Sequence, residues 1–85
     1  MADTYEISWT PAARRALHRL PEKVAAAVIE FIYGPLASNP HRVGKALRLN
    51  LEGLHSARRG DYRIIYRIDT HVMIAAIEHR ADAYR

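Results

Sequence analysis

Seven basic or aromatic side chains in the last third of the sequence are of the types that can cleave RNA. They are Arg58, Arg59, Arg63, Arg67, His79, Arg80 and Tyr84. RNA cuts itself when its 2′-hydroxyl loses a proton, the charge that develops on the scissile phosphate is stabilised, and the leaving 5′-oxygen gains a proton. A base, one or more arginines and an acid meet these three needs. The group therefore fits cleavage of an RNA backbone.

Four side chains of this group can be assigned to the three roles. Arg63 and Arg80 could hold a phosphate through paired hydrogen bonds. Histidine titrates near neutrality, so His79 could act as base or acid, and Tyr84 could share proton transfer or stack on a base. A purely structural interpretation stays open as well. In that interpretation the strand arginines form surface salt bridges, His79 ends a strand, and Tyr84 docks the tail on the core.

The arginines lie on or beside the clearest strand pattern in the sequence, residues 58–69. The side chains alternate in two sets, with Tyr62, Ile64, Tyr66 and Ile68 on one side and Arg63, Ile65 and Arg67 on the other. Such alternation of β-branched and aromatic residues is typical of a half-buried strand. Gly60-Asp61 is a turn signal, so Arg58 and Arg59 should end a preceding strand. We therefore expect a β-hairpin that packs one face on a core and presents guanidinium groups on the other.

The first half of the chain predicts a strand and two helices. Alternating residues indicate a strand over about 3–9. Thr10-Pro11 reads as an N-cap followed by proline at the first helical position, which predicts a helix over about 11–20. Pro21 should start a second helix that runs to about residue 33, where Gly34-Pro35 ends or kinks it. Both helices have one apolar stripe, so they should form a helical hairpin laid on a sheet.

The second half predicts the rest of that sheet. Residues 41–46 are expected to form an exposed connection, and alternating leucines predict a short strand over 47–51 that Gly53 bends. Residues 54–59 continue into the hairpin, 69–71 form a turn, and the apolar run 72–78 fits a central strand buried on both sides. The predicted fold class is α+β, with two N-terminal helices packed on a largely antiparallel four-stranded sheet in the order strand-helix-helix-strand-strand-strand.

Composition limits the chemistry that the chain can carry out. With no cysteine, the chain has no disulfide framework, thiolate metal site or cysteine nucleophile. Its five histidines lack chelating spacing and its four glycines are isolated, so neither a metal site nor a phosphate-binding glycine loop is predicted, and no cofactor is expected. Thirteen basic residues, eleven of them arginine, outnumber nine acidic ones and favour an anionic partner, although an ordinary solvated surface in an arginine-rich proteome would look the same.

Length and apolar content predict one small domain without a membrane segment. Eighty-five residues suffice for a single domain of modest stability. No apolar stretch approaches the roughly 20 residues needed to span a bilayer. Asp3 and Glu6 stand where a secretory signal would be basic and then apolar. We therefore expect a cytoplasmic protein with no membrane partner.

Three segments of the sequence resemble the RelE/ParE superfamily of type II toxin–antitoxin toxins. They are RRGDYRIIY at Arg58–Tyr66, HRADAY at His79–Tyr84, and Lys45-Ala-Leu-Arg48 with the following Gly53-Leu54. The likeness spans almost the whole chain and is closest to the RelE-type mRNA interferases. It implies a single RelE-like toxin domain over residues 1–85, with two N-terminal helices packed on a largely antiparallel sheet.

The resemblance also implies an activity and partners. RelE-like toxins are endoribonucleases that inhibit translation by cleaving mRNA in the ribosomal A site, without a metal, through 2′-hydroxyl attack that gives a cyclic phosphate. A cognate RelB-like antitoxin wraps around the toxin, and operator DNA is bound only through the antitoxin complex. The implied partners are thus the antitoxin, the ribosome and mRNA. Two alternatives stay open: a ParE-like inhibitor of DNA gyrase, and a degenerate toxin that only binds antitoxin and co-represses its operon.

Carried over to this sequence, the resemblance implies a set of catalytic residues. Arg63 takes the place of the strand arginine that contacts the phosphate, and Tyr84 that of the C-terminal tyrosine. Arg80 or His79 stands near the second C-terminal functional position, and Arg58 matches a basic position at the end of the preceding strand. Four further basic residues are expected to bind RNA: Lys45, Arg48, Arg59 and Arg67.

The general base is the part of this set that departs from the family. RelE members carry lysines on the strand before the hairpin turn, and one of them is the proposed base. This chain has His55, Ser56 and Ala57 there. His79 or a neighbouring arginine is left as the substitute, and a weakened or altered activity is possible.

Overall fold

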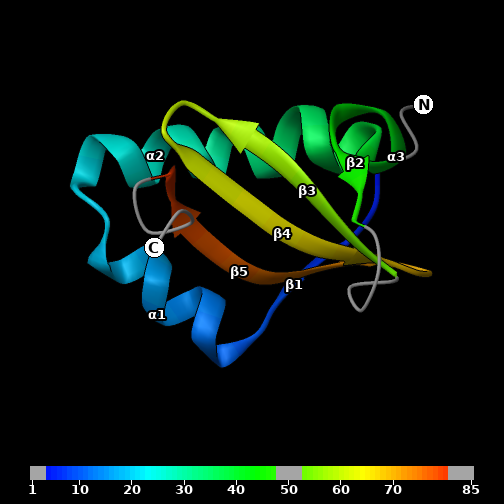
Figure 1. Ribbon diagram of the computed structural model, residues 1–85, viewed down its shortest axis with the longest axis horizontal. Helices are drawn as coiled ribbons and strands as arrows, with labels where there is room; N and C mark the ends of the chain where they lie inside the picture. The colour runs from blue at the N-terminus through cyan, green and yellow to red at the C-terminus, as the bar shows by residue number, and fades with distance from the viewer. Residues whose placement is uncertain (1–3, 48–52, 81–85) are drawn as a thin grey trace.

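Helices and strands form two layers, with the helices on one face of a five-stranded sheet (Figure 1). A computed structural model of the chain describes residues 4–47 and 53–80. The strands are β1 (Ile7–Trp9), β2 (Lys45–Ala46), β3 (Leu54–Arg59), β4 (Tyr62–Ile68) and β5 (Val72–His79). The helices are α1 (Pro11–Arg19), α2 (Glu22–Phe31) and α3 (Pro40–Val43), and η1 (Ile32–Leu36) is a π-helical turn. The strand order is β1-β5-β4-β3-β2, with β1 parallel to β5 and the other pairs antiparallel.

The predicted α+β class is confirmed, with five strands in place of four. The fifth strand comes from residues 41–46, which were predicted to be an exposed connection. Most of them are exposed, but the prediction of a connection without a helix or strand was wrong. Those residues hold most of α3, which starts at the buried Pro40, and β2, whose Lys45 and Ala46 pair with Ser56 and His55. The prolines of this segment indicated a turn and gave no sign of a short helix. The helix depends on the burial of its first residue, which the local sequence does not reveal. The predicted strand over 47–51 lies outside the described residues except for Leu47, whose N–H donates to the Leu54 carbonyl at 2.8 Å.

The junction between β1 and α1 is fixed by one threonine. The Thr10 side chain accepts a hydrogen bond from the Ala13 N–H at 3.1 Å, as its position before Pro11 predicts for an N-cap. Its hydroxyl also donates to the carbonyl of Ala75 in β5 at 2.9 Å. Thr10 therefore anchors the helical layer to the sheet as well as starting α1.

The second helix changes type near the Gly34-Pro35 pair that was expected to end or kink it: α2 ends at Phe31, and a π-helical turn follows. The chain passes from α2 directly into η1, with Pro35 inside the π-helical turn and Leu36 fully buried. Proline has no N–H and its ring clashes with the preceding turn of an α-helix. A π turn widens the backbone locally and so accommodates it.

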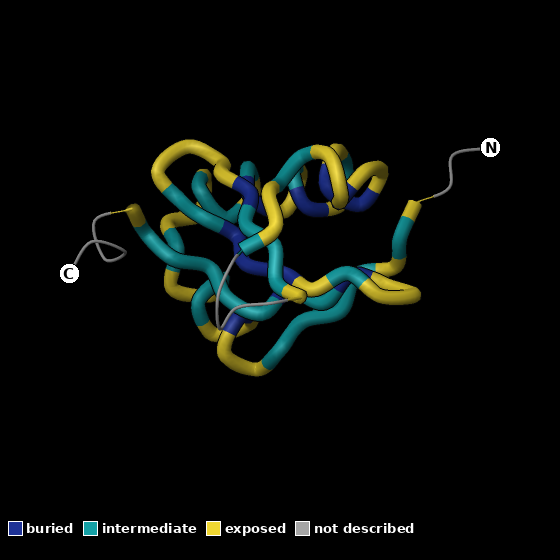
Figure 2. The backbone as a smooth tube through the Cα atoms, turned by 45° about the vertical axis from the view of Figure 1, so that its right-hand side comes forward, coloured by how far each residue is buried: buried dark blue, intermediate teal, exposed yellow. Residues whose placement is uncertain are grey.

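The core lies between the helices and one face of the sheet, which we call the inner face. Residues that alternate along the strands form it together with small and branched residues of the helices: Ala57, Ile64, Tyr66, Val72 and Ile74 against Ala13, Val28, Ile32 and Leu36. Figure 2 shows these buried segments between the layers, with exposed turns at the periphery. In β5 only Val72 and Ile74 are fully buried, so the prediction of a strand buried on both sides was wrong.

Tyr66 is the largest fully buried side chain. Its hydroxyl donates to the Pro40 carbonyl at 2.6 Å, and burial raises the pKa of Tyr66 to about 12. Gly44 lies against it, because a Cβ at that position would overlap the Tyr66 hydroxyl and stand 2.7 Å from the Ser56 carbonyl oxygen. This contact joins α3 and β2 to the centre of the sheet.

A β-bulge divides the pairing of β4 with β5 into two registers. Near the turn, Ile68 pairs with Val72 and Tyr66 with Ile74, whereas beyond the bulge Ile65 pairs with Ala76. Ala75 is the extra residue, and its carbonyl is the one that Thr10 binds. Bulges re-aim the side chains that follow them, so the carboxyl-terminal half of β5 presents the opposite alternation from the one its start would predict.

Candidate functional site

The face of the sheet turned away from the core, which we call the outer face, gathers most of the predicted basic residues. No helix among residues 4–47 and 53–80 packs on it, and it is turned toward the viewer in Figure 1. Strand pairing places its side chains in three rows: Arg58, Arg63 and Glu78; Lys45, Ser56, Ile65 and Ala76; and Leu54, Arg67 and Met73. Four cations and one carboxylate thus share this face.

Arg63 lies at the centre of the first row and is paired with a residue that the sequence did not single out. Its Nη2 donates to Oε1 of Glu78 at 2.9 Å, and the two side chains are 42% and 43% exposed. A guanidinium group has five N–H donors, so one carboxylate leaves several of them available. One of these, Nε, is shielded from solvent and has no hydrogen-bond partner in the described part of the chain.

Arg58 stands directly opposite Arg63 on β3. Side chains in such pairs have Cβ atoms about 4.5–5.5 Å apart, and like charges at that separation repel each other. Glu78 neutralises one of the two cations, since its partner across the sheet is Arg63. An anion placed over the row would be attracted by both arginines, so the row is electrostatically suited to a phosphate group.

A pocket of about 310 Å³ adjoins this row. It is lined by the Arg63–Glu78 pair together with apolar side chains: Leu47, Leu54, Ile65, Ala75 and Ala76. Polar groups at the edge of an apolar pocket are the usual arrangement of a small-molecule or nucleotide site. The pocket could hold the planar base of a nucleotide while Arg63 binds the phosphate of the same nucleotide.

Lys45 and Arg67 flank the pocket and extend the basic surface. Both are exposed. Lys45 shares the face of its partner Ser56, and Arg67 packs its guanidinium group against Gly53, where a Cβ would stand 2.6 Å from Nη1. Both predicted RNA-binding residues are therefore brought to the same face as Arg63.

Arg59 and His79 lie on the other side of the sheet from Arg63. They share a row with Tyr62, and the Tyr62 and His79 rings meet edge-on with centroids 4.9 Å apart. Since neighbouring residues of a strand point to opposite faces, Arg59 cannot accompany Arg58 nor His79 accompany Glu78. The structure thus separates these two predicted residues from the outer face.

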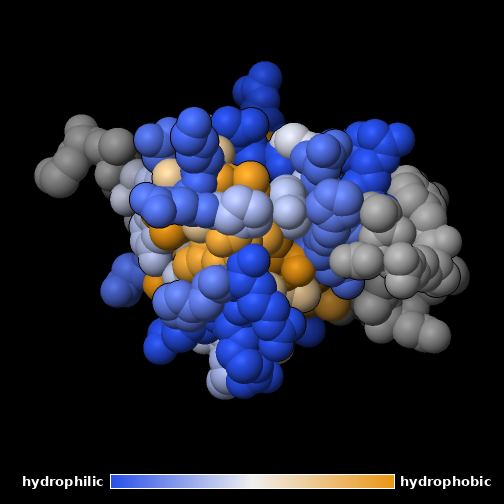
Figure 3. Space-filling model, turned by 90° about the vertical axis from the view of Figure 1, so that its left-hand side faces the viewer, coloured by the Kyte–Doolittle hydropathy of each residue, from blue (hydrophilic) through white to orange (hydrophobic). Residues whose placement is uncertain are grey.

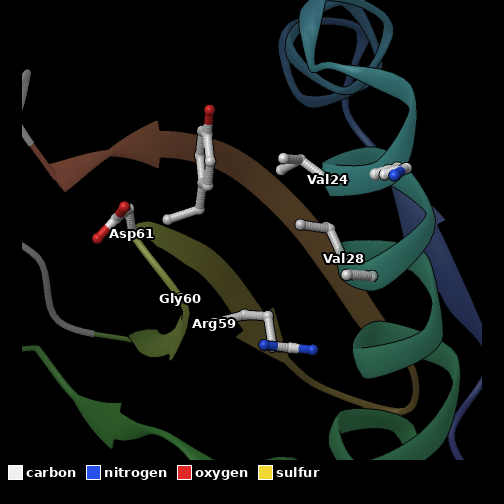
Figure 4. A pocket seen from close by; sticks show the side chains of 8 residues that line it. Val24, Val28, Arg59, Gly60 and Asp61 are labelled. Carbon is white, nitrogen blue, oxygen red and sulfur yellow. The ribbon is translucent and has the colours of Figure 1, made fainter.

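Arg59 lines a second pocket, of about 250 Å³, between α2 and the turn of the hairpin. Figure 4 shows Val24 and Val28 of α2 facing the turn that carries Arg59 and Asp61. In Figure 3, which views this end of the molecule, apolar surface lies at the centre and hydrophilic side chains surround it. The apolar lining distinguishes this pocket from the charged row on the outer face.

The remaining predicted site residues follow β5 or lie outside the described residues. Arg80 is exposed, and its backbone N–H donates to the Asp61 carbonyl at 2.7 Å, which holds the end of β5 at the hairpin turn. Arg48 and Tyr84 lie outside the described residues. The placement of Arg48 and Tyr84 therefore stays a prediction.

The residues that replace the family lysines are divided between the two faces. Ser56 is on the outer face, whereas Ala57 and His55 are on the inner face. The His55 ring stacks on Tyr66 with centroids 5.6 Å apart and lies 5.9 Å from that of His41. Burial, and to a smaller extent the neighbouring His41, lowers the pKa of His55 below the usual 6.5. His55 is therefore a partly buried residue of the inner face and lies across the sheet from the row of Arg58 and Arg63.

Neither a metal cluster nor a membrane helix is found in the part of the chain that the structure describes. Residues 4–47 and 53–80 contain no group of three or more histidine, cysteine, aspartate or glutamate side chains placed to hold a metal ion. Within the same ranges, every helix is too short or too polar to cross a bilayer.

Comparison with known proteins assigns this small α+β domain to a toxin family. The chain belongs to the family described as the ParE toxin of the type II toxin–antitoxin system parDE, whose model matches residues 7–84. It is therefore the toxin component of a type II toxin–antitoxin system, as the RelE/ParE resemblance predicted.

Named relatives narrow the comparison to the RelE branch. Toxin RelE of Mycobacterium tuberculosis is 57% identical over 84 residues, covering 95% of this chain and 87% of that protein. Toxin RelG of the same organism is 54% identical, covering 95% and 97%. The toxin–antitoxin complex RelBE2 of M. tuberculosis contains a chain that superposes with a TM-score of 0.89 at 50% identity, covering 96% of this chain and 98% of that one.

Proposed function

We propose that this toxin is an endoribonuclease that cuts mRNA bound in the ribosomal A site and so stops translation. The observation that carries the proposal is that Arg58 and Arg63 lie directly opposite each other on the outer face. Glu78, the one carboxylate in their row, pairs with Arg63 and leaves the row with a net positive charge. A phosphate group bound over this row would act as the second counter-ion. The names of the relatives, Toxin RelE and Toxin RelG, support the same activity.

Side chains of the outer face are proposed to carry the main steps of the reaction. Arg63, with Arg58 beside it, would bind the scissile phosphate and stabilise the charge that builds up on its oxygens during attack by the 2′-hydroxyl. The apolar pocket floor, with Ile65 at its centre, would receive a base next to that phosphate. Lys45 and Arg67 would hold the flanking backbone. Arg80 and Tyr84 are proposed to complete the site from the C-terminal side, as in the family.

Mapping RNA ends on translating ribosomes tests this function. Purified toxin is incubated with ribosomes stalled on a defined message, and new 5′ ends are located by primer extension. We expect cuts within the A-site codon and 2′,3′-cyclic phosphate on the upstream fragment. An intact message at stoichiometric toxin would overturn the proposal.

The partner that we propose is a RelB-like antitoxin. The structurally similar RelBE2 chain is part of a toxin–antitoxin complex. A basic outer face favours binding to an acidic segment, and a small domain gains stability from any partner that binds only its folded state. Operator DNA would then be bound through the antitoxin complex, and the toxin would act in the cytoplasm, where ribosomes are.

Inhibition of DNA gyrase is the second candidate, because the matching family model is described as a ParE toxin. A supercoiling assay separates the two activities. Toxin that leaves gyrase-dependent supercoiling intact while it cuts ribosome-bound mRNA supports the ribonuclease. A third candidate, a degenerate toxin that only binds antitoxin and co-represses its operon, is rejected by growth arrest when the toxin is expressed alone.

A further inference from the structure

We propose that Glu78 is the general base of the cleavage reaction. This inference rests on the proposed ribonuclease function and fills the role that the missing family lysines leave vacant. Glu78 is the residue that strand pairing and a 2.9 Å ion pair place beside Arg63. No other glutamate or aspartate in residues 4–47 and 53–80 belongs to the three rows of the outer face.

Proximity to Arg63 suits Glu78 for this role. In RNA, the 2′-hydroxyl is attached to the sugar carbon next to the one that carries the scissile phosphate. A base that deprotonates it must therefore lie within a few ångströms of the group that holds the phosphate. Glu78 Oε1 touches one nitrogen of Arg63, while the other guanidinium donors are left for phosphate oxygens. The carboxylate is 43% exposed, so a hydroxyl group can reach it from solvent.

The competing residues are less well placed. His79 lies on the inner-face side against Tyr62, and His55 is on the same side, stacked on Tyr66. An arginine is always protonated at physiological pH and cannot accept a proton. An ionised carboxylate, by contrast, has free lone pairs on both oxygens and can accept a proton.

The bulge in β5 is what brings Glu78 to this position. Continuing the register in which Ile68 pairs with Val72 would set Ile77 opposite Arg63 and turn Glu78 toward the helices. The extra residue, Ala75, shifts the pairing by one, so Glu78 faces Arg63 and Ile77 packs against the core. The hydrogen bond from Thr10 to the Ala75 carbonyl holds this irregular segment in place.

In the proposed step the Glu78 carboxylate takes the proton of the 2′-hydroxyl as the O2′–P bond forms. The P–O5′ bond breaks, and the departing 5′-oxygen takes a proton from water or from an acidic side chain. The products are a 2′,3′-cyclic phosphate and a 5′-hydroxyl. Glu78 then releases its proton to solvent, which restores the carboxylate.

The test compares Glu78→Gln with wild type in single-turnover cleavage on ribosome-bound mRNA across a range of pH. Glutamine keeps the size of the side chain and can still accept a hydrogen bond from Arg63, but it cannot take up the proton. We expect a loss of at least about 100-fold in the cleavage rate at neutral pH, since general acid–base catalysis contributes about 10²–10⁴-fold. Ribosome binding should be unchanged or tighter, because one negative charge has been removed from a basic face.

The pH profile distinguishes a base from a residue that merely positions Arg63. The wild-type cleavage rate should fall at acidic pH, where a carboxylate base would be protonated. The cleavage rate of the variant should lack this acidic step and increase steadily with the hydroxide concentration. A positioning role would lower the rate at every pH and keep the shape of the wild-type profile, which would overturn the proposal. So would a wild-type rate in the variant.

Two controls keep these outcomes interpretable. Glu30→Gln makes the same charge change at an exposed position of α2 and should cleave like wild type. Thermal unfolding of Glu78→Gln should match wild type, and Glu78→Asp, which keeps the carboxylate, should cleave faster than the glutamine variant even if its own stability falls. Failure of wild type to cleave would reject the ribonuclease function itself, together with a base for it, whereas cleavage by wild type and Glu78→Gln alike would reject only the role of Glu78.

Discussion

The two faces of β4 show how one strand divides stability from chemistry. On the inner face, Ile64 and Tyr66 are fully buried, and the Tyr66 hydroxyl has its acceptor. On the outer face, the alternating residues include Arg63 and Arg67, and Arg63 keeps donors that no described side chain satisfies. Adjacent residues of the same strand therefore have different roles. The inner face holds the fold together, and the outer face carries the charged residues of the proposed site.

The largest effect is expected from Ile64→Ala on the inner face. The side chain is fully buried, so its removal leaves a cavity and should lower the free energy of unfolding by about 2–5 kcal/mol. Ile29→Ala, at a position 39% exposed on α2, is the matched control and should change it by no more than about 0.5 kcal/mol. Urea unfolding measures both. Equal costs at the two positions would contradict the assignment of the core.

Tyr66→Phe should have the next largest effect. The variant keeps the ring but leaves the buried Pro40 carbonyl without its donor, which should cost about 1–3 kcal/mol. Tyr33→Phe removes a hydroxyl from a side chain that is 52% exposed and should leave stability nearly unchanged. Cleavage by folded Tyr66→Phe should equal that of wild type. A stability equal to that of wild type would show that this hydrogen bond is not a support of the fold.

Arg58→Ala and Arg59→Ala sharpen the comparison, because adjacent arginines make the same charge change on opposite faces. Loss of Arg58 removes the cation opposite Arg63, so cleavage should fall about tenfold at low salt. Loss of Arg59, which lines the pocket beside α2, should change cleavage by no more than about threefold. Single-turnover rates on ribosome-bound mRNA provide the measurement. Equal losses would mean that net charge, and not the face, controls cleavage.

The smallest effect should come from His55, and it depends on pH. Burial and His41 lower the pKa of His55 in the folded protein below 6.5, so the unfolded chain takes up the proton first as the pH falls. The stabilising contribution of neutral His55 is therefore complete above 6.5 and is lost as the pH falls through 6.5 toward the lowered folded value. Urea unfolding at several pH values should show a shallower loss for His55→Gln than for wild type. An unchanged slope for His55→Gln would contradict this account.

Local sequence patterns predicted the parts of the fold that local physics controls. The Thr10-Pro11 cap, the break at Pro21, the Gly60 turn and the alternation of β4 all depend on neighbours in the chain. Gly60 adopts a φ of 62°, which glycine tolerates without strain. The same patterns missed α3 and β2, which are stabilised by burial of Pro40 and by pairing with β3 rather than by their own residues.

The grouping of basic residues on the outer face was predicted in part, and there is a physical reason why Glu78 was not predicted beside them. Alternation identified Arg63 and Arg67 as neighbours on one face, and it also implied that Arg58 and Arg59 point apart, which their joint assignment to RNA overlooked. Glu78 could not be found in the same way, because its partner depends on a bulge in the pairing of β4 with β5, and the sequence carries no local signal for that bulge. A single inserted residue reverses which side chains face Arg63.

The most direct test of the account is to measure cleavage and stability together for Arg63→Ala. The variant loses the guanidinium group that is proposed to bind the scissile phosphate, so cleavage of ribosome-bound mRNA should fall by about 10²–10³-fold. Its free energy of unfolding should stay within about 1 kcal/mol of wild type, because the side chain is 42% exposed and its ion pair with Glu78 is solvent-screened. A folded Arg63→Ala protein that cuts mRNA at the wild-type rate would contradict the claim that this face is the site of chemistry.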